Sequence, residues 1–377
     1  MGQEGKRSIK SAFTEVTGEG EVGEQLQMAK AARGIVLGAL PLSRFCSGHV
    51  YFVQRLPYVI GVTPLVVHTT YQFSQARGKR QRLRENGLWL IDDDGYYSGE
   101  GSKGFVAMHP ADQPPAELLT KGIANHLDAA AWYRLATRNL IAVARATGRI
   151  PVLPRIVCLC DRYWGNVLPG CNIPGSDQHP PFMQCPQDHI MNLPNMERAG
   201  VDWREWSFFD APRLPKAFAH ADNRVFVELE ASDGVIVGSK ADGTRKDGTG
   251  VVENVGRTVR LPAYPTDKQW VAALGDAPER VMFVSSGVAS FCTFEDAAIG
   301  RSFDEQMATA LQAESHFCGY GSGGHARSCE IGFDVPKGTI EDAKECDAMR
   351  AAVGKAGGEV GDAFRSRYAQ IGRHQDS

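Results

Sequence analysis

The middle of the chain contains the pattern that most restricts the fold, a long helical segment followed at once by a short apolar one. Residues 127–147 carry leucine, isoleucine and valine at helical spacing among many alanines, and Gly148 follows where a helix C-cap is expected. Residues 150–154 then form an apolar run of strand length. A helix that leads directly into a buried strand is typical of α/β folds.

Other segments fit the same fold class. Residues 65–67 form a short apolar run, as expected of a strand buried on both faces, and residues 224–230 and 281–284 also look like strands. Helices are predicted over residues 25–38, which end in glycine, and over residues 303–316. Together these segments predict an α/β protein.

With 377 residues, 43% of them hydrophobic, the chain can bury a full core and has the length of two modest domains. Composition and spacing place a boundary near residue 124. The expected parts are a disordered lead-in (1–24), a first α/β part (25–123), a second α/β unit (124–335) that contains a Cys/Pro-rich loop (155–194) and a loop insertion (238–256), and a partly disordered tail (336–377).

The overall charge is close to neutral, with 41 basic and 44 acidic residues and a formal net charge of −3. It provides no general attraction to nucleic acid or to membranes. No stretch approaches the roughly eighteen unbroken apolar residues of a membrane helix, and residues 1–10 are too polar for a secretory signal. We therefore expect no nucleic-acid partner, and no membrane segment, signal or anchor within this chain.

A histidine and a basic loop follow the predicted strand at residues 65–67. His68 ends that strand, and open α/β folds bind their ligands at the carboxyl edge of the sheet. A strand-terminal histidine can bind a metal ion. A glycine lets the backbone approach a phosphate, and lysine and arginine supply positive charge. The predicted diphosphate contacts are Gly78, Lys79, Arg80, Arg82 and Arg84.

Each of these features also has a structural explanation. A single histidine after a strand is often structural, and a run of basic residues is often a solvated face or a nuclear-targeting segment. Against nucleic acid, no aromatic residues are interleaved with the basic run. Asp92 and Asp94 follow an apolar run and could bind a metal ion through oxygen, or they could form an acidic turn into Gly95.

Eight short motifs between residues 44 and 215 form a recognisable set. They are VHTTYQF (67–73), GKRQRLRE (78–85), GYY (95–97), GFV (104–106), GRIPVLP (148–154), CLCDRYWG (158–165), CPQDH (185–189) and REWSFFDAP (204–212). The set resembles the plant and green-algal members of glycosyltransferase family seventy-seven, nucleotide-diphospho-sugar transferases that include the extensin arabinosyltransferases.

The resemblance implies an α/β fold of the GT-A type, with a Rossmann-like mixed sheet, and a retaining reaction. It also implies a UDP-sugar donor, with arabinofuranose as the sugar, and a divalent metal such as Mn2+. Members of the family modify hydroxyproline-rich cell-wall glycoproteins in the Golgi lumen. In related retaining transferases a late histidine binds the metal and a following glycine and lysine contact the diphosphate, roles that would fall to His68, Gly78 and Lys79.

The sequence departs from the family at its N-terminal end. Family members carry an Asp-x-Asp metal motif on an earlier strand, and nothing before Leu40 resembles it. We therefore expect residues 25–123 to be the C-terminal half of a GT-A-like domain that is incomplete at its N-terminus, and we assign no catalytic base. The alternative is a truncated, non-catalytic relative that binds a glycoprotein or another transferase.

Four cysteines fall in the Pro-rich loop: Cys158, Cys160, Cys171 and Cys185. They could form two disulfides in an oxidising compartment or remain free thiols in the cytosol, and their spacing lacks the Cys-x-x-Cys knuckle of most zinc sites. Polar and aromatic residues in a braced loop are candidate contacts for the acceptor. These are Asp161, Arg162, Trp164, Asp188 and His189, and their structural alternative is a buried salt bridge beside a packed tryptophan.

Overall fold

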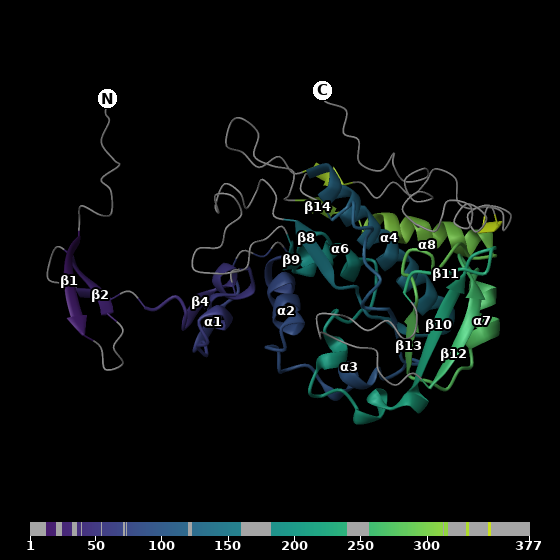
Figure 1. Cartoon of the computed structure of the whole chain (residues 1–377), viewed down its shortest axis with the longest axis horizontal. Helices are drawn as coiled ribbons and strands as arrows, with labels where there is room; N and C mark the ends of the chain where they lie inside the picture. Colours follow the sequence, from purple (N-terminus) through teal and green to yellow (C-terminus); the bar gives the residue numbers. More distant parts are fainter. Residues whose placement is uncertain are drawn as a thin grey trace, which may run out of the picture. The chain divides into compact units, whose positions relative to one another are not determined.

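The computed structural model describes residues 13–19, 25–31, 36–38, 40–53, 55–70, 72, 74–119, 123–159, 182–239, 256–311, 313–315, 329–331 and 346–347 (Figure 1). The chain divides into two units. Unit 1 comprises Met1–Tyr71 and Ile173–Asp177, and unit 2 comprises Gln72–Asn172 and Gln178–Ser377. The division lies earlier than the boundary expected near residue 124, because strand β6 (Phe105–Met108) is a central strand of the sheet of unit 2.

Unit 1 begins with an antiparallel sheet of β1 (Phe13–Glu19), β2 (Gln25–Ala31) and β3 (Val36–Gly38). The helix predicted over residues 25–38 is therefore wrong, and β1 lies within the lead-in that was expected to be disordered. The sequence Gln-Leu-Gln-Met at the start of β2 alternates polar and apolar residues, which is the period of a strand rather than of a helix.

The rest of unit 1 contains a second, smaller sheet. Strands β4 (Phe45–Ser47) and β5 (Val66–His68) pair in parallel, and between them lie the π-helical turn η3 (His49–Val53) and the short helix α1 (Leu56–Val59). The predicted strand at residues 65–67 is present, but it is not buried on both faces, because Leu65 is 67% exposed and Val66 is 47% exposed. With a single neighbouring strand, β5 lacks the cover that an inner strand has.

Unit 2 is built on a mainly parallel sheet, so the predicted α/β class with a Rossmann-like sheet is confirmed. The order of its parallel strands is β7, β6, β13, β10, β12, and a short strand, β11, pairs antiparallel with the end of β10. The bounds are β7 (Ile150–Pro151), β10 (Arg224–Glu230), β11 (Ile236–Val237), β12 (Arg257–Pro262) and β13 (Val281–Val284).

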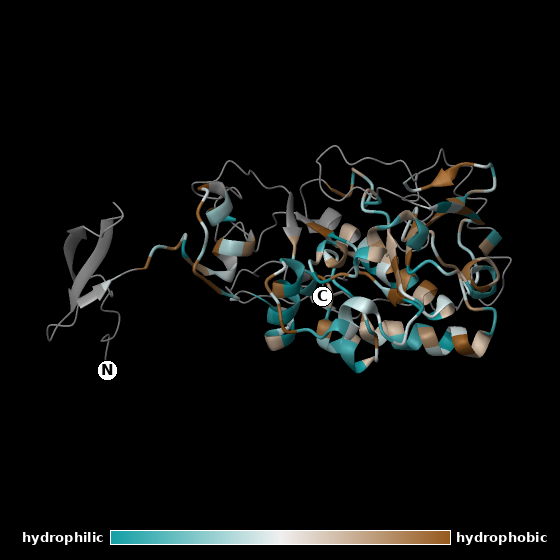
Figure 2. Ribbon diagram, turned by 90° about the horizontal axis from the view of Figure 1, so that it is seen from below, coloured by the Kyte–Doolittle hydropathy of each residue, from teal (hydrophilic) through white to brown (hydrophobic). Residues whose placement is uncertain are grey.

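Two helices cover one face of this sheet. Helix α4 (Ile123–Thr147) connects β6 to β7, and α7 (Asp267–Leu274) connects β12 to β13. Both connections move in the same direction along the sheet, so right-handed crossovers place both helices on the same face, where they contact each other. The helices of the protein carry both hydrophilic and hydrophobic residues (Figure 2). From residue 129 to residue 144, every residue of α4 except Arg138 is buried, whereas α7 buries Trp270 and Leu274.

The other face carries an aromatic cluster. Successive residues of a strand point to opposite faces, so Val106 and Met108 of β6 join the core under α4, whereas Phe105 and Ala107 point to the opposite side. There they pack with Phe226 and Phe283 of the neighbouring strands. Helix α3 (Asp94–Ser98) and the 3-10 turns η6 (Phe208–Asp210), η7 (Lys216–Ala219) and η8 (Ala221–Asn223) lie in this part of unit 2.

The remaining elements of unit 2 surround these two layers. Helix α8 (Ala297–Ala310) starts earlier than the helix predicted at residue 303, because Asp296 caps its first turn. Other elements are α2 (Gln75–Glu85), the antiparallel pair β8 (Ile156–Leu159) and β9 (Phe182–Cys185), η5 (Gln187–His189), α6 (Leu193–Arg198), and the pair β14 (Ala313–Ser315) and β15 (Cys329–Ile331). Among the described residues, no helix is both long enough and apolar enough to span a membrane.

Candidate functional site

The predicted basic loop is in fact helix α2, which carries all five predicted diphosphate contacts. Gln187 connects the C-terminal end of α2 to Pro154, which follows the carboxyl end of β7, through two hydrogen bonds. Gln187, whose backbone N–H donates to Glu85 of α2 (3.0 Å), also donates through its side chain to the carbonyl oxygen of Pro154 (3.3 Å). Helix α2 therefore lies near the carboxyl edge of a parallel sheet, where α/β proteins bind ligands.

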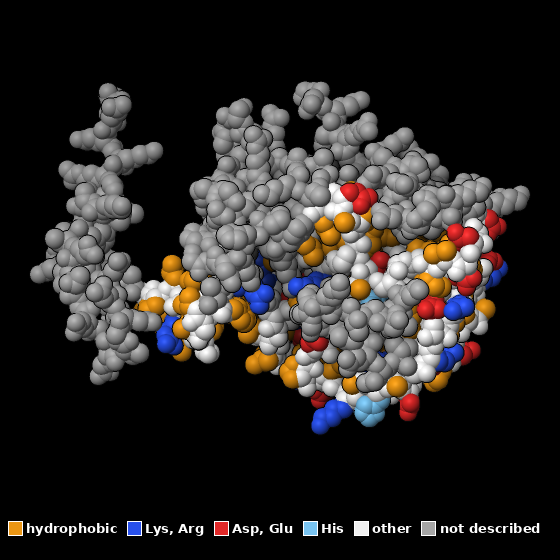
Figure 3. Space-filling view, in the orientation of Figure 1, with side chains coloured by type: hydrophobic (Ala, Val, Ile, Leu, Met, Phe, Trp, Pro, Cys, Tyr) orange, Lys and Arg blue, Asp and Glu red, His pale blue; other side chains and the backbone are white. Residues whose placement is uncertain are grey.

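Most cationic side chains of α2 are engaged by carboxylates. Figure 3 shows Lys and Arg side chains in the region of this helix. Arg77 and Arg80 both pair with Glu197 of α6, the latter at 2.8 Å, and Arg84 forms a two-pronged pair with Asp92 (2.5 and 2.7 Å). Within the described part of the chain, Lys79 forms no ion pair. The charge that remains open on α2 is therefore smaller than the sequence indicates.

Gly78 and Arg82 both lie next to the buried carboxylate of Asp188. A guanidinium nitrogen of Arg82 lies 3.4 Å from a carboxylate oxygen of Asp188, and both side chains are 1% exposed. A methyl group added at Gly78 would lie 2.5 Å from the other oxygen of Asp188. Asp188 therefore shows the buried salt bridge that was the structural alternative to acceptor contact, and Gly78 provides the space for its carboxylate.

The predicted metal ligands are distributed over both units. His68 is the exposed last residue of β5 in unit 1, whereas Asp92 and Asp94 lie at the start of α3 in unit 2. Asp92 accepts hydrogen bonds from Arg84 and from Trp89, and Asp94 pairs with Arg213 at 2.6 Å. Among the described residues, no group of three or more His, Cys, Asp or Glu side chains is arranged to hold a metal ion. The metal roles of these residues stay predictions.

The other predicted acceptor contacts are only partly visible. His189 lies in η5, next to Asp188, but its side chain falls outside the described part. Asp161, Arg162 and Trp164 also lie outside the described residues, together with Cys160 and Cys171. Their proposed contacts with an acceptor stay predictions.

No protein-family model matches this chain. Over 191 residues, it is 39% identical to the protein named Arabinosyltransferase XEG113 of Arabidopsis thaliana. The chain is therefore similar to a plant arabinosyltransferase over about half of its own length. The resemblance found from the motifs is thus confirmed. The matched region covers 48% of this chain and 28% of the length of the relative, so the activity, substrates and partners of the longer protein are proposals for this chain.

Among solved structures, this chain is similar to a crystal structure of POFUT1 in complex with GDP-fucose. The match covers 55% of this chain and 52% of the POFUT1 chain. The sequence identity is 13% and the TM-score is 0.30, which is too low to support any structural or functional argument.

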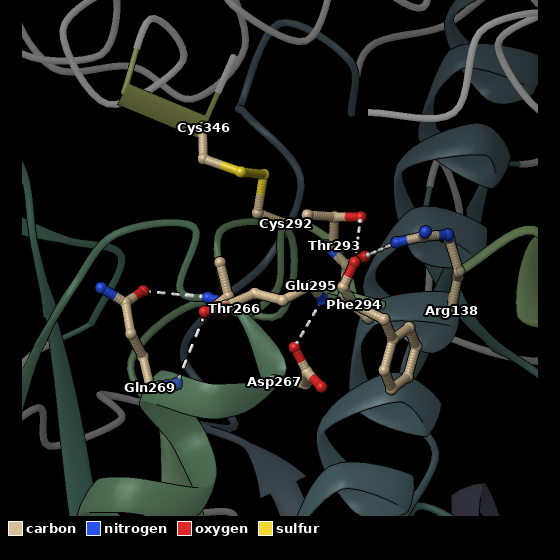
Figure 4. Close-up of a disulfide and its surroundings, with 10 residues drawn as sticks. Arg138, Thr266, Asp267, Gln269, Cys292, Thr293, Phe294, Glu295 and Cys346 are labelled. Carbon is tan, nitrogen blue, oxygen red and sulfur yellow. Dashed lines mark hydrogen bonds between the residues drawn. A yellow bond between two sulfur atoms is a disulfide. The ribbon is translucent and has the colours of Figure 1, made fainter. Parts of the chain in front are cut away.

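The cysteines show one bond that the sequence did not predict. Cys185, one of the disulfide candidates, is disulfide-bonded, and Cys158 lies in β8 with its side chain outside the described part. A further disulfide joins Cys292 to Cys346, with a Cα–Cα distance of 5.9 Å and a sequence separation of 54 (Figure 4). Both of these sulfur atoms belong to buried residues. Nothing in the spacing of these two cysteines indicates the pairing.

A second polar cluster at the carboxyl edge was also missed. Asp112, in the loop after β6, accepts a hydrogen bond from the backbone N–H of Gly287, in the loop after β13 (2.7 Å). Burial raises the pKa of Asp112 to about 7, although its bonds to Gly287 and Ser286 oppose this rise. The cluster joins two adjacent loops and contains a carboxyl group that can exchange a proton near neutral pH. The available signal was the polar sequence that follows each of two central strands.

Proposed function

We propose that this chain forms part of a glycosyltransferase that transfers arabinofuranose from a UDP-linked donor to a hydroxyproline-rich cell-wall glycoprotein with retention of configuration. The observation that carries the proposal is the 39% identity to an arabinosyltransferase over 191 residues. The natural setting for such a reaction is the Golgi lumen, and an oxidising lumen is compatible with the disulfides of Cys185 and Cys292.

In this proposal, α2 stabilises the UDP leaving group. Negative charge develops on the diphosphate as the glycosidic bond breaks, and fixed cations beside it lower the energy of the transition state. Lys79 can supply such a charge because it forms no ion pair among the described residues, and Arg80, which is partly exposed, can contribute from the next position. We assign no protein base, since the leaving diphosphate can itself accept the proton of the acceptor hydroxyl.

A divalent ion such as manganese would supply further positive charge to the diphosphate. His68, which is exposed at the end of β5 in unit 1, stays a ligand predicted from the sequence, and no position relative to α2 is assigned to it. Asp92 does not suit such a role, since both of its carboxylate oxygens accept hydrogen bonds from Arg84. No step of the proposed reaction is assigned to the metal.

The test is incubation of the chain with UDP-arabinofuranose, manganese and a hydroxyproline-rich peptide, followed by mass spectrometry for the gain of one pentose. The anomeric configuration of the product, read by NMR, tests retention. Lys79→Ala should lower transfer and weaken UDP binding by about tenfold, the equivalent of one lost charge contact. The matched control, Lys268→Ala, removes an exposed lysine of α7 that pairs with Glu295, and it should change neither quantity. Equal activity of the two variants would remove Lys79 from the site.

The second candidate function is a non-catalytic module that binds a glycoprotein or a partner transferase. It is favoured by the carboxylates of Glu197, Asp188 and Asp92, which engage four of the arginines of α2. Retention of a hydroxyproline-rich glycoprotein by the chain, with no pentose transferred under any metal condition, would support this function. Transfer by the chain alone would exclude it.

A further inference from the structure

The side of α2 that faces the protein is polar, which is unusual for a buried helix face. Its buried residues are Gly78, Gln81, Arg82 and Glu85. Residues spaced by three and four positions share one face of a helix, so these four form a single stripe. A helix that buries such a stripe needs specific partners, because buried polar groups without hydrogen bonds are costly.

The turn η5 supplies those partners. The side chain of Gln81 donates to the side-chain oxygen of Gln187 (2.5 Å) and accepts from the indole N–H of Trp203 (3.3 Å). The carboxyl of Glu85 accepts from the backbone N–H of Gln187 (3.0 Å), and Arg82 pairs with Asp188. Because η5 directly follows β9, the same contacts connect α2 to the hairpin of β8 and β9.

Among the described residues, the contacts between α2 and η5 include the carboxyl groups of Asp188 and Glu85 and the guanidinium of Arg82. Asp188 is placed to balance the charge of Arg82, whereas Glu85 bonds to a neutral backbone N–H. The charged groups that face Glu85 among the described residues are Arg82 and Asp188. Burial, reinforced by the negative charge of Asp188, raises the pKa of Glu85 to about 8. Glu85 is thus the carboxyl that can remain neutral.

We propose that Asp188, Arg82 and Glu85 are positioning residues, which fasten α2 to the turn after β9 through one buried ion pair and the hydrogen bond that Glu85 accepts from Gln187. Their contacts hold α2, with the side that carries Lys79, at the carboxyl end of the sheet. In this proposal Asp188 does not contact the acceptor and Arg82 does not contact the diphosphate, which were the roles predicted for them from the sequence. The functional part of the inference rests on the proposed function, because α2 is there the helix that contacts UDP.

The test is hydrogen–deuterium exchange of the α2 and η5 peptides in the full chain, combined with titration of UDP in the presence of manganese. Asp188→Asn should raise exchange in α2 by about tenfold or more, because it removes the carboxylate that pairs with the buried guanidinium of Arg82. It should also weaken UDP binding. Glu85→Gln should keep exchange and UDP affinity within about twofold of the wild type, since a neutral amide can replace a neutral carboxyl. The control, Glu228→Gln, removes an exposed ion pair with Arg260 and should leave α2 unchanged.

A pH series and a double variant make the test specific. Above pH 8, α2 of the wild type should lose protection as Glu85 ionises, whereas α2 of Glu85→Gln should not. Arg82→Met combined with Asp188→Leu removes both charges, so it should keep α2 docked even where Asp188→Asn does not fold. If this double variant binds UDP as the wild type does, Arg82 does not contact phosphate.

Two results would overturn the inference. One is equal loosening of α2 by Glu85→Gln and by Asp188→Asn, and the other is loss of UDP binding by the double variant while α2 stays protected. If the wild type fails to bind UDP but the exchange pattern appears as expected, the proposed sugar-donor role is wrong and the positioning network stands.

Discussion

The disulfide between Cys292 and Cys346 should contribute strongly to the stability of unit 2. It joins the loop after β13 to the segment around residue 346, and it packs against the main core. Replacing both cysteines with alanine removes the cross-link without burying a new polar group. For a sequence separation of 54, the loop-entropy relation gives about 14 cal/mol/K, or about 4 kcal/mol at 25 °C.

The assay is urea unfolding followed by tryptophan fluorescence. Trp132 and Trp270 are suitable reporters, since both are almost fully buried in the core that contains Cys292. The matched control is Cys46→Ala, which removes a buried free cysteine in unit 1 and should not affect the transition of unit 2. A reducing agent alone is a weaker test, because Cys185 is also disulfide-bonded. A loss below about 1 kcal/mol in the double variant would refute the loop-entropy reasoning.

Two further predictions concern the carboxyl and amino edges of the same sheet. Asp112 has its pKa raised from 3.8 to about 7 in the folded state, so its contribution to stability is full below pH 3.8 and is lost as the pH rises through 7. Asp112→Asn keeps a hydrogen-bond acceptor but does not titrate. In urea unfolding, the wild type should therefore lose stability relative to the variant between pH 4 and 8, by at most about 1.4 kcal/mol per pH unit. Parallel curves of stability against pH for the two proteins would contradict this prediction. Gly104→Ala should cost about 3 kcal/mol or more in the same assay, because its methyl group would lie 2.0 Å from the carbonyl oxygen of Arg280 at a φ of +121°. Gly101→Ala, at a φ of +77° with open space around it, measures the backbone strain alone, and an equal loss in both variants would exclude the steric explanation.

The sheet and the long helix could be predicted because their sequences leave few alternatives. Strands β10 and β13 have the predicted bounds, and α4 covers the predicted segment at residues 127–147. A continuous apolar run of four residues between turn signals is stable only when both faces are covered. In unit 1 the same reasoning failed at β5, since its apolar residues lie in a two-stranded sheet with little cover.

The contacts of the candidate site could not be predicted, because they depend on residues far apart in the sequence. Asp188 and Glu197 are more than one hundred positions from the arginines that they engage. Their sequence neighbours indicate only a polar loop and a short helix. The disulfide of Cys292 has the same property, since its partner lies beyond α8 and outside the Cys-rich loop that drew attention.

The basic run itself shows why charge density along a sequence differs from charge density in space. Successive residues of a helix point about 100° apart, so the seven residues from 78 to 84 are distributed around the whole axis. Gly78, Arg82 and Glu85 fall on the buried face, and Lys79 falls outside it. A loop could direct all of these cations to a single phosphate, but a helix cannot. Because α2 is a helix, the run separates into residues on the buried face and residues that remain open to a ligand, and only the second group is available for the diphosphate contact that we propose.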